Sequence, residues 1–211
     1  HLADRHDRAL WMRDEAHIDP RAALAHLRHR LEQDGAQFEQ TEAEPESAED
    51  GPVIDCRGFA ARDALPDLRG VKGEMVVLRA HEVQLSRPVR LLHPRFPLYI
   101  VPRGEGVFML GATQIESQER GRASARSVME LLSAAYALNP AFGEAEVLEI
   151  GADARPAFPD NLPRITRNGN TLHVNGLFRH GFLLSPAVAR QVAELVMRDT
   201  ETPELYHEDH A

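Results

Sequence analysis

Residues 98–113 read LYIVPRGEGVFMLGAT, two short apolar segments on either side of a turn that contains two glycines. The segments 98–102 and 107–111 are rich in β-branched and aromatic residues, and the turn between them favours a β-hairpin. Strands of mixed polarity are also expected at 74–79 and 89–93, in close succession with the hairpin. This part of the chain is therefore predicted to form an antiparallel sheet.

Helical patterns flank the predicted sheet. Helices are expected at 20–34, where Asp19 is a candidate N-cap and Gly35 a C-terminal stop, and at 123–138. The final helix is expected to begin at Ser185-Pro186, because serine caps helices and proline suits the first helical position. Further strands are expected at 36–39, 52–56, 147–152 and 171–174. This order predicts an α/β fold interrupted by an inserted α+β unit.

The composition argues against several classes of protein. A chain of 211 residues, 43% of them hydrophobic, is long enough for a buried core, and no apolar run approaches the roughly 20 residues that a bilayer requires. A net charge of -9 argues against a nucleic-acid partner. The single cysteine, Cys56, allows no internal disulfide and is typical of a reducing cytoplasm. Since it lies in the apolar segment PVIDC, we expect a buried core residue rather than a nucleophile.

Familiar catalytic motifs are not found. The 11 histidines form no HExxH pattern, so no metal site is expected. The sequence contains no G-x-S-x-G elbow, no G-x-G-x-x-G fingerprint and no Walker loop. The acidic run 41–50 is expected to be a solvated loop.

Two segments with a central arginine stand out. In GADARPAFPDNLP (151–163), Arg155 follows a predicted strand and precedes a proline, so its planar guanidinium could bind a carboxylate. In NGLFRHGFLLSP (175–186), Arg179 lies in a turn between a strand and a helix, where backbone N–H groups favour an anion. The alternative is that both arginines form ordinary surface ion pairs, which the spacing alone favours.

Six segments together resemble the D-amino-acid oxidase superfamily of flavoproteins, and within it the glycine oxidases of thiamine biosynthesis. The motifs occur in the expected order over nearly the whole chain. They are WMRDEAHIDPRAALAHLRHRLE (11–32), VIDCRGFAA (53–61), GVKGEMVVLRA (70–80), LYIVPRGEGVFMLGAT (98–113), ARPAFPDNLPRI (154–165) and NGLFRHGFLLSPAVA (175–189).

The resemblance implies an FAD-dependent oxidase that deaminates a small, glycine-like amino acid to its imine, with peroxide formed and the imine used for thiamine thiazole synthesis. It implies that Arg155 binds the substrate carboxylate, that Tyr99 closes over the substrate and that Arg179 lies at the floor of the site. No residue is assigned as a catalytic acid or base, because flavin accepts the hydride. A homo-oligomer is compatible with the resemblance. The cofactor-binding residues that it implies are Arg179, His180, Gly181, Phe182, Leu183 and Leu184.

The sequence departs from the family pattern at three places, and these differences bear on the identity of the substrate more than on the reaction class. Asp153 and Ala154 stand where the family usually has Gly-Leu, Leu177 stands where histidine is common, and His180 stands where asparagine is common.

The resemblance also implies a domain organisation. Residues 1–62 and 165–211 are expected to be parts of an FAD-binding domain, and residues 63–164 to be the antiparallel-sheet substrate domain. The dinucleotide fingerprint of the superfamily precedes the matched motifs, so we expect the chain to be a C-terminal portion that is inactive by itself. The alternative from another class is a non-catalytic domain that binds an anionic metabolite or a protein through Arg155 and Arg179.

Overall fold

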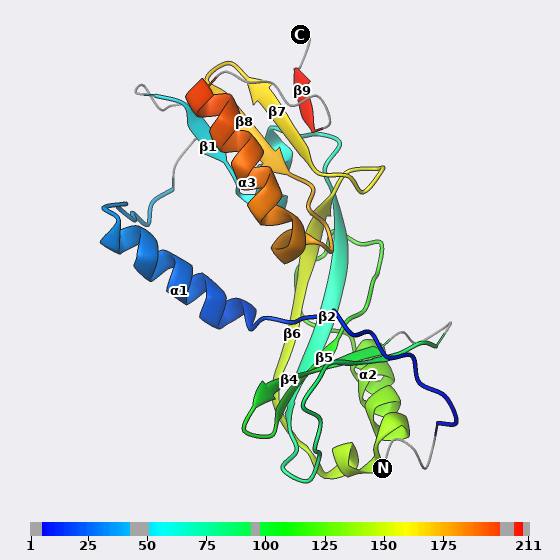
Figure 1. The fold of residues 1–211 in the computed structure, drawn as a ribbon. Coiled ribbons are helices and arrows are strands. Elements are labelled where there is room, and N and C mark those ends of the chain that lie inside the picture. Colours follow the sequence, from blue (N-terminus) through cyan, green and yellow to red (C-terminus); the bar gives the residue numbers. More distant parts are fainter. Residues whose placement is uncertain (1–5, 43–50, 94–97, 199–204, 209–211) are drawn as a thin grey trace. The chain divides into compact units, whose positions relative to one another are not determined.

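The computed structural model describes residues 6–42, 51–93, 98–198 and 205–208, and it divides into two compact units (Figure 1). The first unit contains 72–115, 119–153 and the chain up to Arg28. The second contains 29–71, 116–118 and the chain from Ala154 onward. The two units are described separately below.

An antiparallel sheet dominates the first unit, in agreement with the sequence. Its strand order is β3-β4-β5-β2-β6, and the hairpin pairs Tyr99 with Gly111 and Ile100 with Leu110. The strands are β2 (Arg69–Arg79), β3 (Val89–Leu91), β4 (Leu98–Gly104), β5 (Val107–Gly111) and β6 (Glu146–Ala157). Strands β2 and β6 are longer than the predicted 74–79 and 147–152. Hydrogen bonds to neighbouring strands extend them, and a local sequence pattern does not show which strands will be neighbours.

Helix α2 (Ala125–Leu138) covers one face of this sheet. Ile100 and Leu110 pack in a common core with Leu131 of the helix, and the 3₁₀-helix η3 (Pro140–Glu144) adds Phe142. Because side chains alternate along a strand, Tyr99 and Gly111 lie on the opposite face from this core. The predicted hairpin thus presents Tyr99 away from α2.

Two buried charged residues of β2 hold the connection between β5 and α2. The Glu74 carboxylate accepts hydrogen bonds from the Thr113 hydroxyl at 3.1 Å and from the Ser124 backbone N–H at 2.9 Å. Lys72 donates to the Arg122 carbonyl at 2.9 Å and pairs with Glu119. The start and the end of this connection are therefore both fixed to β2.

A four-stranded sheet of order β1-β8-β7-β9 forms the second unit. Strand β1 (Val53–Asp55) is parallel to β8 (Thr171–Asn175), which forms a hairpin with β7 (Arg164–Asn168), and β7 is parallel to β9 (Tyr206–Glu208). Helix α3 (Gly181–Arg198) packs against this sheet through Val188, Val192 and Leu195. The 3₁₀-helix η2 (Gly58–Asp63) contributes Phe59 to a separate core cluster with Phe158.

Helix α1 (Pro20–Gln33) has the predicted caps, but it buries no residue among those described. The Asp19 carboxylate accepts the N–H of Ala22 at 2.9 Å, and Gly35 adopts a φ of 95°. The leucine stripe is exposed by 57% at Leu24, 55% at Leu27 and 41% at Leu31. Local capping therefore determines the limits of α1, whereas the stripe remains without a covering partner in the described residues.

Three predictions about this part of the chain are wrong or lie outside the described residues. Residues 36–39 are irregular, because no strand in the described ranges pairs with them. Cys56 is exposed rather than buried, since it follows the end of the short strand β1. Most of the predicted acidic loop, 43–50, lies outside the description.

The start of the last helix is also corrected. Helix α3 begins at Gly181, one turn before the predicted Ser185-Pro186 cap, and Pro186 lies inside it. The Ser185 hydroxyl donates to the Gly181 carbonyl at 2.5 Å, so this serine bonds back into the first turn instead of capping the helix. A proline this close to the start removes few helical hydrogen bonds, and packing of the remaining helix against the sheet offsets their loss.

Candidate active site

Arg155 lies near the end of strand β6, in the second unit. Its neighbour Ala154 is buried in the cluster that contains Phe59 and Phe158, and alternation along the strand directs Arg155 away from that cluster. The Arg155 side chain is half-buried. The strand fixes the base of this side chain.

Arg179 lies in the turn between β8 and α3. This turn contains Gly176 with a φ of 80° and Phe178 with a φ of 49°, and the N–H of His180 donates to the Leu177 carbonyl at 2.9 Å. Arg179 itself is exposed. The sequence correctly predicted a glycine-containing turn that presents this arginine before a helix.

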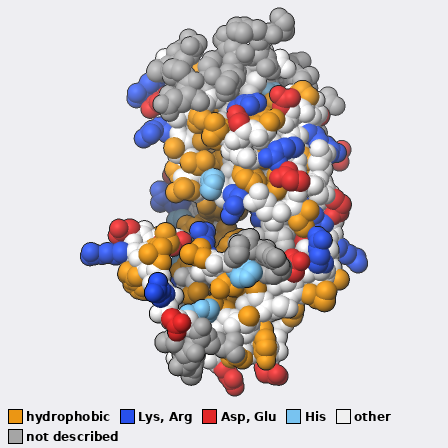
Figure 2. All heavy atoms as spheres, turned by 90° about the vertical axis from the view of Figure 1, so that its right-hand side faces the viewer, with side chains coloured by type: hydrophobic (Ala, Val, Ile, Leu, Met, Phe, Trp, Pro, Cys, Tyr) orange, Lys and Arg blue, Asp and Glu red, His pale blue; other side chains and the backbone are white. Residues whose placement is uncertain are grey.

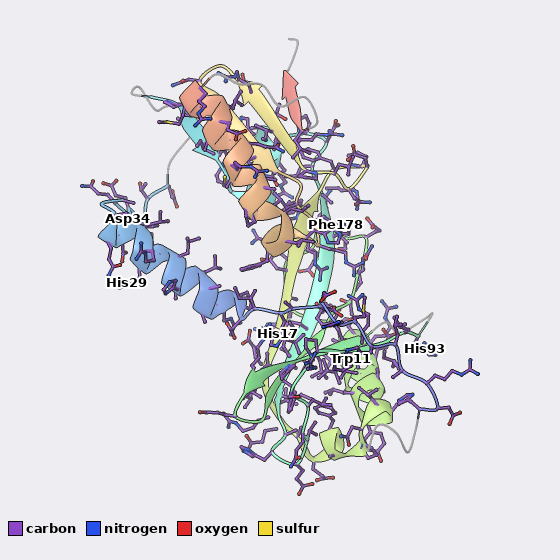
Figure 3. All side chains as sticks on the ribbon, viewed as in Figure 1. Trp11, His17, His29, Asp34, His93 and Phe178 are labelled. Atoms are coloured by element: carbon purple, nitrogen blue, oxygen red, sulfur yellow. The ribbon has the colours of Figure 1, made fainter. Side chains whose placement is uncertain are left out.

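The structure brings the two arginine-containing segments together. The backbone N–H of Phe178 donates to the Pro156 carbonyl at 3.1 Å, so the residues that adjoin Arg179 and Arg155 are bonded directly. The Phe158 ring packs against Gly176, where an added Cβ would lie 2.7 Å from Cε2 of the ring. Figure 3 labels Phe178 close to the start of α3, beside the end of β6. Sequence spacing gave no signal for this contact.

The first turn of α3 is the candidate cofactor-binding segment. Its first N–H groups, at Gly181, Phe182 and Leu183, have no acceptor within the helix, whereas the N–H of Leu184 donates to the His180 carbonyl at 2.8 Å. The side chains of Phe182 and Leu183 are 50% and 77% exposed. Open amides beside exposed apolar side chains suit a planar, partly anionic ring such as a flavin. The predicted residues 180–184 therefore fit FAD.

Exposed apolar side chains are not confined to that turn. Figure 2 shows hydrophobic side chains in patches among charged residues on one face of the molecule. Exposed apolar patches of this kind are found on surfaces that contact a ligand or another protein segment.

Tyr99 lies on β4 in the first unit, whereas both arginines belong to the second. Its ring lies across Gly111 of the neighbouring strand: an added Cβ at Gly111 would be 2.6 Å from the Tyr99 hydroxyl oxygen. The half-buried Tyr99 ring therefore packs against Gly111, where a residue with a side chain would collide with it. The structure brings the arginine segments together and places Tyr99 on a separate unit.

A buried polar network beside the site was not predicted. The Asp55 carboxylate accepts hydrogen bonds from Arg57 at 2.9 and 3.0 Å, and it lies 3.0 Å from Nδ1 of His173. Burial opposes ionisation of Asp55, but the hydrogen bonds from Arg57 and His173 outweigh it, and the pKa lies below its usual value. A charged residue within the apolar segment PVIDC was the signal for this network.

The network also joins the ends of β1 and β8. Arg57 forms a second ion pair with Asp63 at 3.0 Å, and the Asn175 side chain donates to the Gly58 carbonyl at 2.8 Å. Cys56 lies beside it, and partial burial together with the negative charge of Asp55 raises the pKa of the thiol. A raised pKa disfavours the thiolate, so Cys56 remains unsuited to nucleophilic attack although it is exposed.

Two kinds of site are not found in the described part of the chain. No cluster of three or more His, Cys, Asp or Glu side chains is arranged to hold a metal ion there. In the same residues, no helix combines the length and the apolar character needed to cross a membrane.

These features define an α/β protein with an antiparallel sheet in one unit and, in the other, a helix whose N-terminal N–H groups are open. The family model described as "FAD dependent oxidoreductase" matches residues 1–195, and the chain belongs to this family. The predicted family, its FAD cofactor and the predicted fold class are thereby confirmed.

The chain is similar to longer proteins in the same family. It is 56% identical over 203 residues to a putative thiamine biosynthesis oxidoreductase, ThiO, of Rhizobium etli, a match that covers 96% of this chain and 62% of the relative. It is 36% identical over 138 residues to a glycine oxidase of Geobacillus kaustophilus, covering 61% of this chain and 34% of that protein.

Solved structures give the same picture. The crystal structure of glycine oxidase from Geobacillus kaustophilus matches with a TM-score of 0.62 and 30% identity, over 72% of this chain and 42% of that one. Glycine oxidase from Bacillus cereus matches with a TM-score of 0.64 and 26% identity, over 73% and 44%. The chain thus spans less than two thirds of each of these relatives.

Proposed function

We propose that the protein takes part in the FAD-dependent oxidative deamination of a small, glycine-like amino acid. The hydrogen bond between Phe178 and Pro156 carries this proposal, because it holds two arginine segments together beside the open N-terminus of α3. Similarity to proteins named as a ThiO and as glycine oxidases supports the choice of substrate class.

Arg155 is proposed to bind the substrate carboxylate. A guanidinium presents two parallel N–H donors to two carboxylate oxygens, which fixes both the position and the orientation of a small amino acid. Strand β6 holds the base of the side chain, and its half-burial strengthens the charge-assisted bonds by excluding part of the solvent.

Arg179 and Tyr99 are proposed to complete the substrate site. Arg179, in the turn before α3, would form the floor of the site and add positive charge next to the carboxylate. Tyr99, seated on Gly111, would close over the substrate and limit the size of its side chain.

The first turn of α3 is proposed to bind the flavin, through Arg179, His180 and the segment 181–184. The backbone N–H groups of this turn and the positive end of the helix dipole would stabilise negative charge next to them. When bound, FAD supplies the acceptor for the hydride that leaves the substrate Cα, and oxygen regenerates it with peroxide formed. The roles of the protein residues are to bind the carboxylate, to orient the Cα–H bond and to exclude water.

The same proposal includes a domain assignment and a cellular role. Residues 1–62 and 165–211 would belong to the cofactor domain, and 63–164 to the substrate domain. The imine product would be consumed in thiamine thiazole synthesis, in a reducing cytoplasm compatible with the single free thiol Cys56.

The test compares the 211-residue chain with the complete translation product of its gene. Each is mixed with FAD, and the flavin absorption spectrum is recorded before oxygen consumption is measured with glycine, sarcosine and D-amino acids. We expect a perturbed flavin spectrum and oxygen uptake with a small amino acid for the complete product. A complete product that shifts no flavin band and consumes no oxygen would falsify the proposal and favour a non-catalytic anion-binding domain.

A further inference from the structure

Phe178 has an unusual backbone conformation for a large residue. Among the described residues, Glu105, Asn161 and Phe178 are the non-glycine residues with a positive φ, at 49°, 61° and 49°. Asparagine tolerates this left-handed region, and Glu105 lies in a tight hairpin turn between two glycines. A bulky residue there is strained, and such strain persists only where the surrounding structure imposes it.

The contacts that impose this conformation are all within the second unit. The N–H of Phe178 is bonded to the Pro156 carbonyl at 3.1 Å, and the preceding Gly176 is packed against the Phe158 ring. After Phe178, the N–H of His180 closes the turn on Leu177 at 2.9 Å, and α3 starts at once. The Phe178 side chain is half-buried, and its backbone N–H holds the turn to the Pro156 carbonyl.

We propose that Phe178 is a positioning residue that sets the spacing between Arg155 and Arg179, an inference that rests on the proposed function. The two bonded residues, Pro156 and Phe178, each adjoin one of the arginines in sequence. A change in the conformation of residue 178 therefore moves Arg179 relative to Arg155. Recognition of a carboxylate by two guanidinium groups tolerates shifts of only about 0.5 Å.

The experiment measures carboxylate binding and stability in the same variants. Glycolate, a small carboxylate without an amine, is titrated into the FAD-loaded complete gene product by calorimetry, and Tm is recorded for each protein. Phe178→Gly and Phe178→Ala both remove the ring, and each is expected to raise the Kd for glycolate about tenfold or more. Phe178→Tyr keeps the ring and is expected to retain the parent Kd.

The Tm values of the variants test whether the backbone of residue 178 is strained, independently of glycolate binding. Phe178→Ala and Phe178→Gly differ only by a Cβ, which is unfavourable at positive φ, so the alanine variant is expected to have the lower Tm. Glu105→Gly is the matched control, because it changes a residue of the same φ in a turn that contains neither arginine. It is expected to leave the Kd for glycolate unchanged.

The arginine variants distinguish failure of this inference from failure of the proposed function. If Arg155→Ala and Arg179→Ala raise the Kd while the glycine and alanine variants of Phe178 do not, the positioning role is overturned and the proposed site stands. If the two arginine variants also bind glycolate as tightly as the parent, the proposed site is wrong as well. Equal Tm values for Phe178→Ala and Phe178→Gly would contradict the strain that the inference requires.

Discussion

The backbone N–H of Phe178 donates a hydrogen bond of 3.1 Å to the carbonyl of Pro156. The two residues are far apart in the sequence, and each directly follows or precedes an arginine that was assigned to the substrate site. This backbone bond joins the end of β6 to the turn before α3.

Replacement of Arg155 by alanine is expected to raise the KM for the amino-acid substrate. Loss of charge-assisted bonds to a carboxylate costs about 1.5–3 kcal/mol, which corresponds to an increase of about 10- to 150-fold. Steady-state oxygen uptake by the complete gene product measures the effect. Arg126→Ala is the control, since Arg126 is an exposed arginine on α2. An unchanged KM for Arg155→Ala would exclude the carboxylate-binding role.

Substitution of Gly111 by alanine is expected to displace the Tyr99 ring. The added Cβ would lie 2.6 Å from the Tyr99 hydroxyl oxygen, well inside van der Waals contact, and such overpacking costs about 1–3 kcal/mol. Urea unfolding of Gly111→Ala in the parent and in a Tyr99→Ala background measures this cost. The clash should disappear in the double variant. An equal loss of stability in both backgrounds would mean that the ring does not lie across Gly111.

Gly176→Ala is expected to be severely destabilising, whereas Gly169→Ala should have a mild effect. Both glycines have a positive φ, of 80° and 56°, but only at Gly176 would the new Cβ overlap the Phe158 ring. The φ penalty alone is about 1–2 kcal/mol, and the overlap adds about 1–3 kcal/mol. Denaturant midpoints of the two variants give the difference. Similar midpoints would show that Phe158 does not pack on Gly176.

Acid should unfold the parent protein more steeply than its Glu74→Gln variant. Burial raises the pKa of Glu74, but bonds from Ser127, Ser124 and Thr113 and the charge of Lys72 outweigh it, so the folded-state pKa lies below the ordinary 4.5. A depressed folded-state pKa adds stability above the unfolded-state value, and this stability is lost as the pH falls from about 4.5 through the folded-state value.

Urea unfolding at several pH values between 7 and 3 tests this prediction. At pH 7 Glu74→Gln should be less stable than the parent, since it replaces the buried carboxylate that accepts hydrogen bonds from Thr113 and Ser124 by a neutral amide. The gap should narrow toward pH 3. Glu130→Gln, at a partly exposed position of α2, is the control and should keep the pH profile of the parent. A constant gap at all pH values would contradict the assignment.

The sequence by itself determined the helices and strands whose ends are set by capping and turn residues close to them in the chain. The hairpin at 98–111 follows from its β-branched residues and its glycine turn, and α1 follows from Asp19, Pro20 and Gly35. The predicted site segments also came from the sequence, through the resemblance that the family match confirms. The roles assigned to Tyr99, Arg155 and Arg179 remain predictions.

Tertiary structure decided the features that depend on residues far apart in the chain. The amphipathic stripe of α1 gave no indication that it would be exposed, and the Ser-Pro signal placed the start of α3 one turn too late. The bond between Phe178 and Pro156 and the seat of Tyr99 on Gly111 each join different strands or turns. Capping and turn preferences act over a few residues, whereas such contacts arise only when packing brings distant backbone segments together.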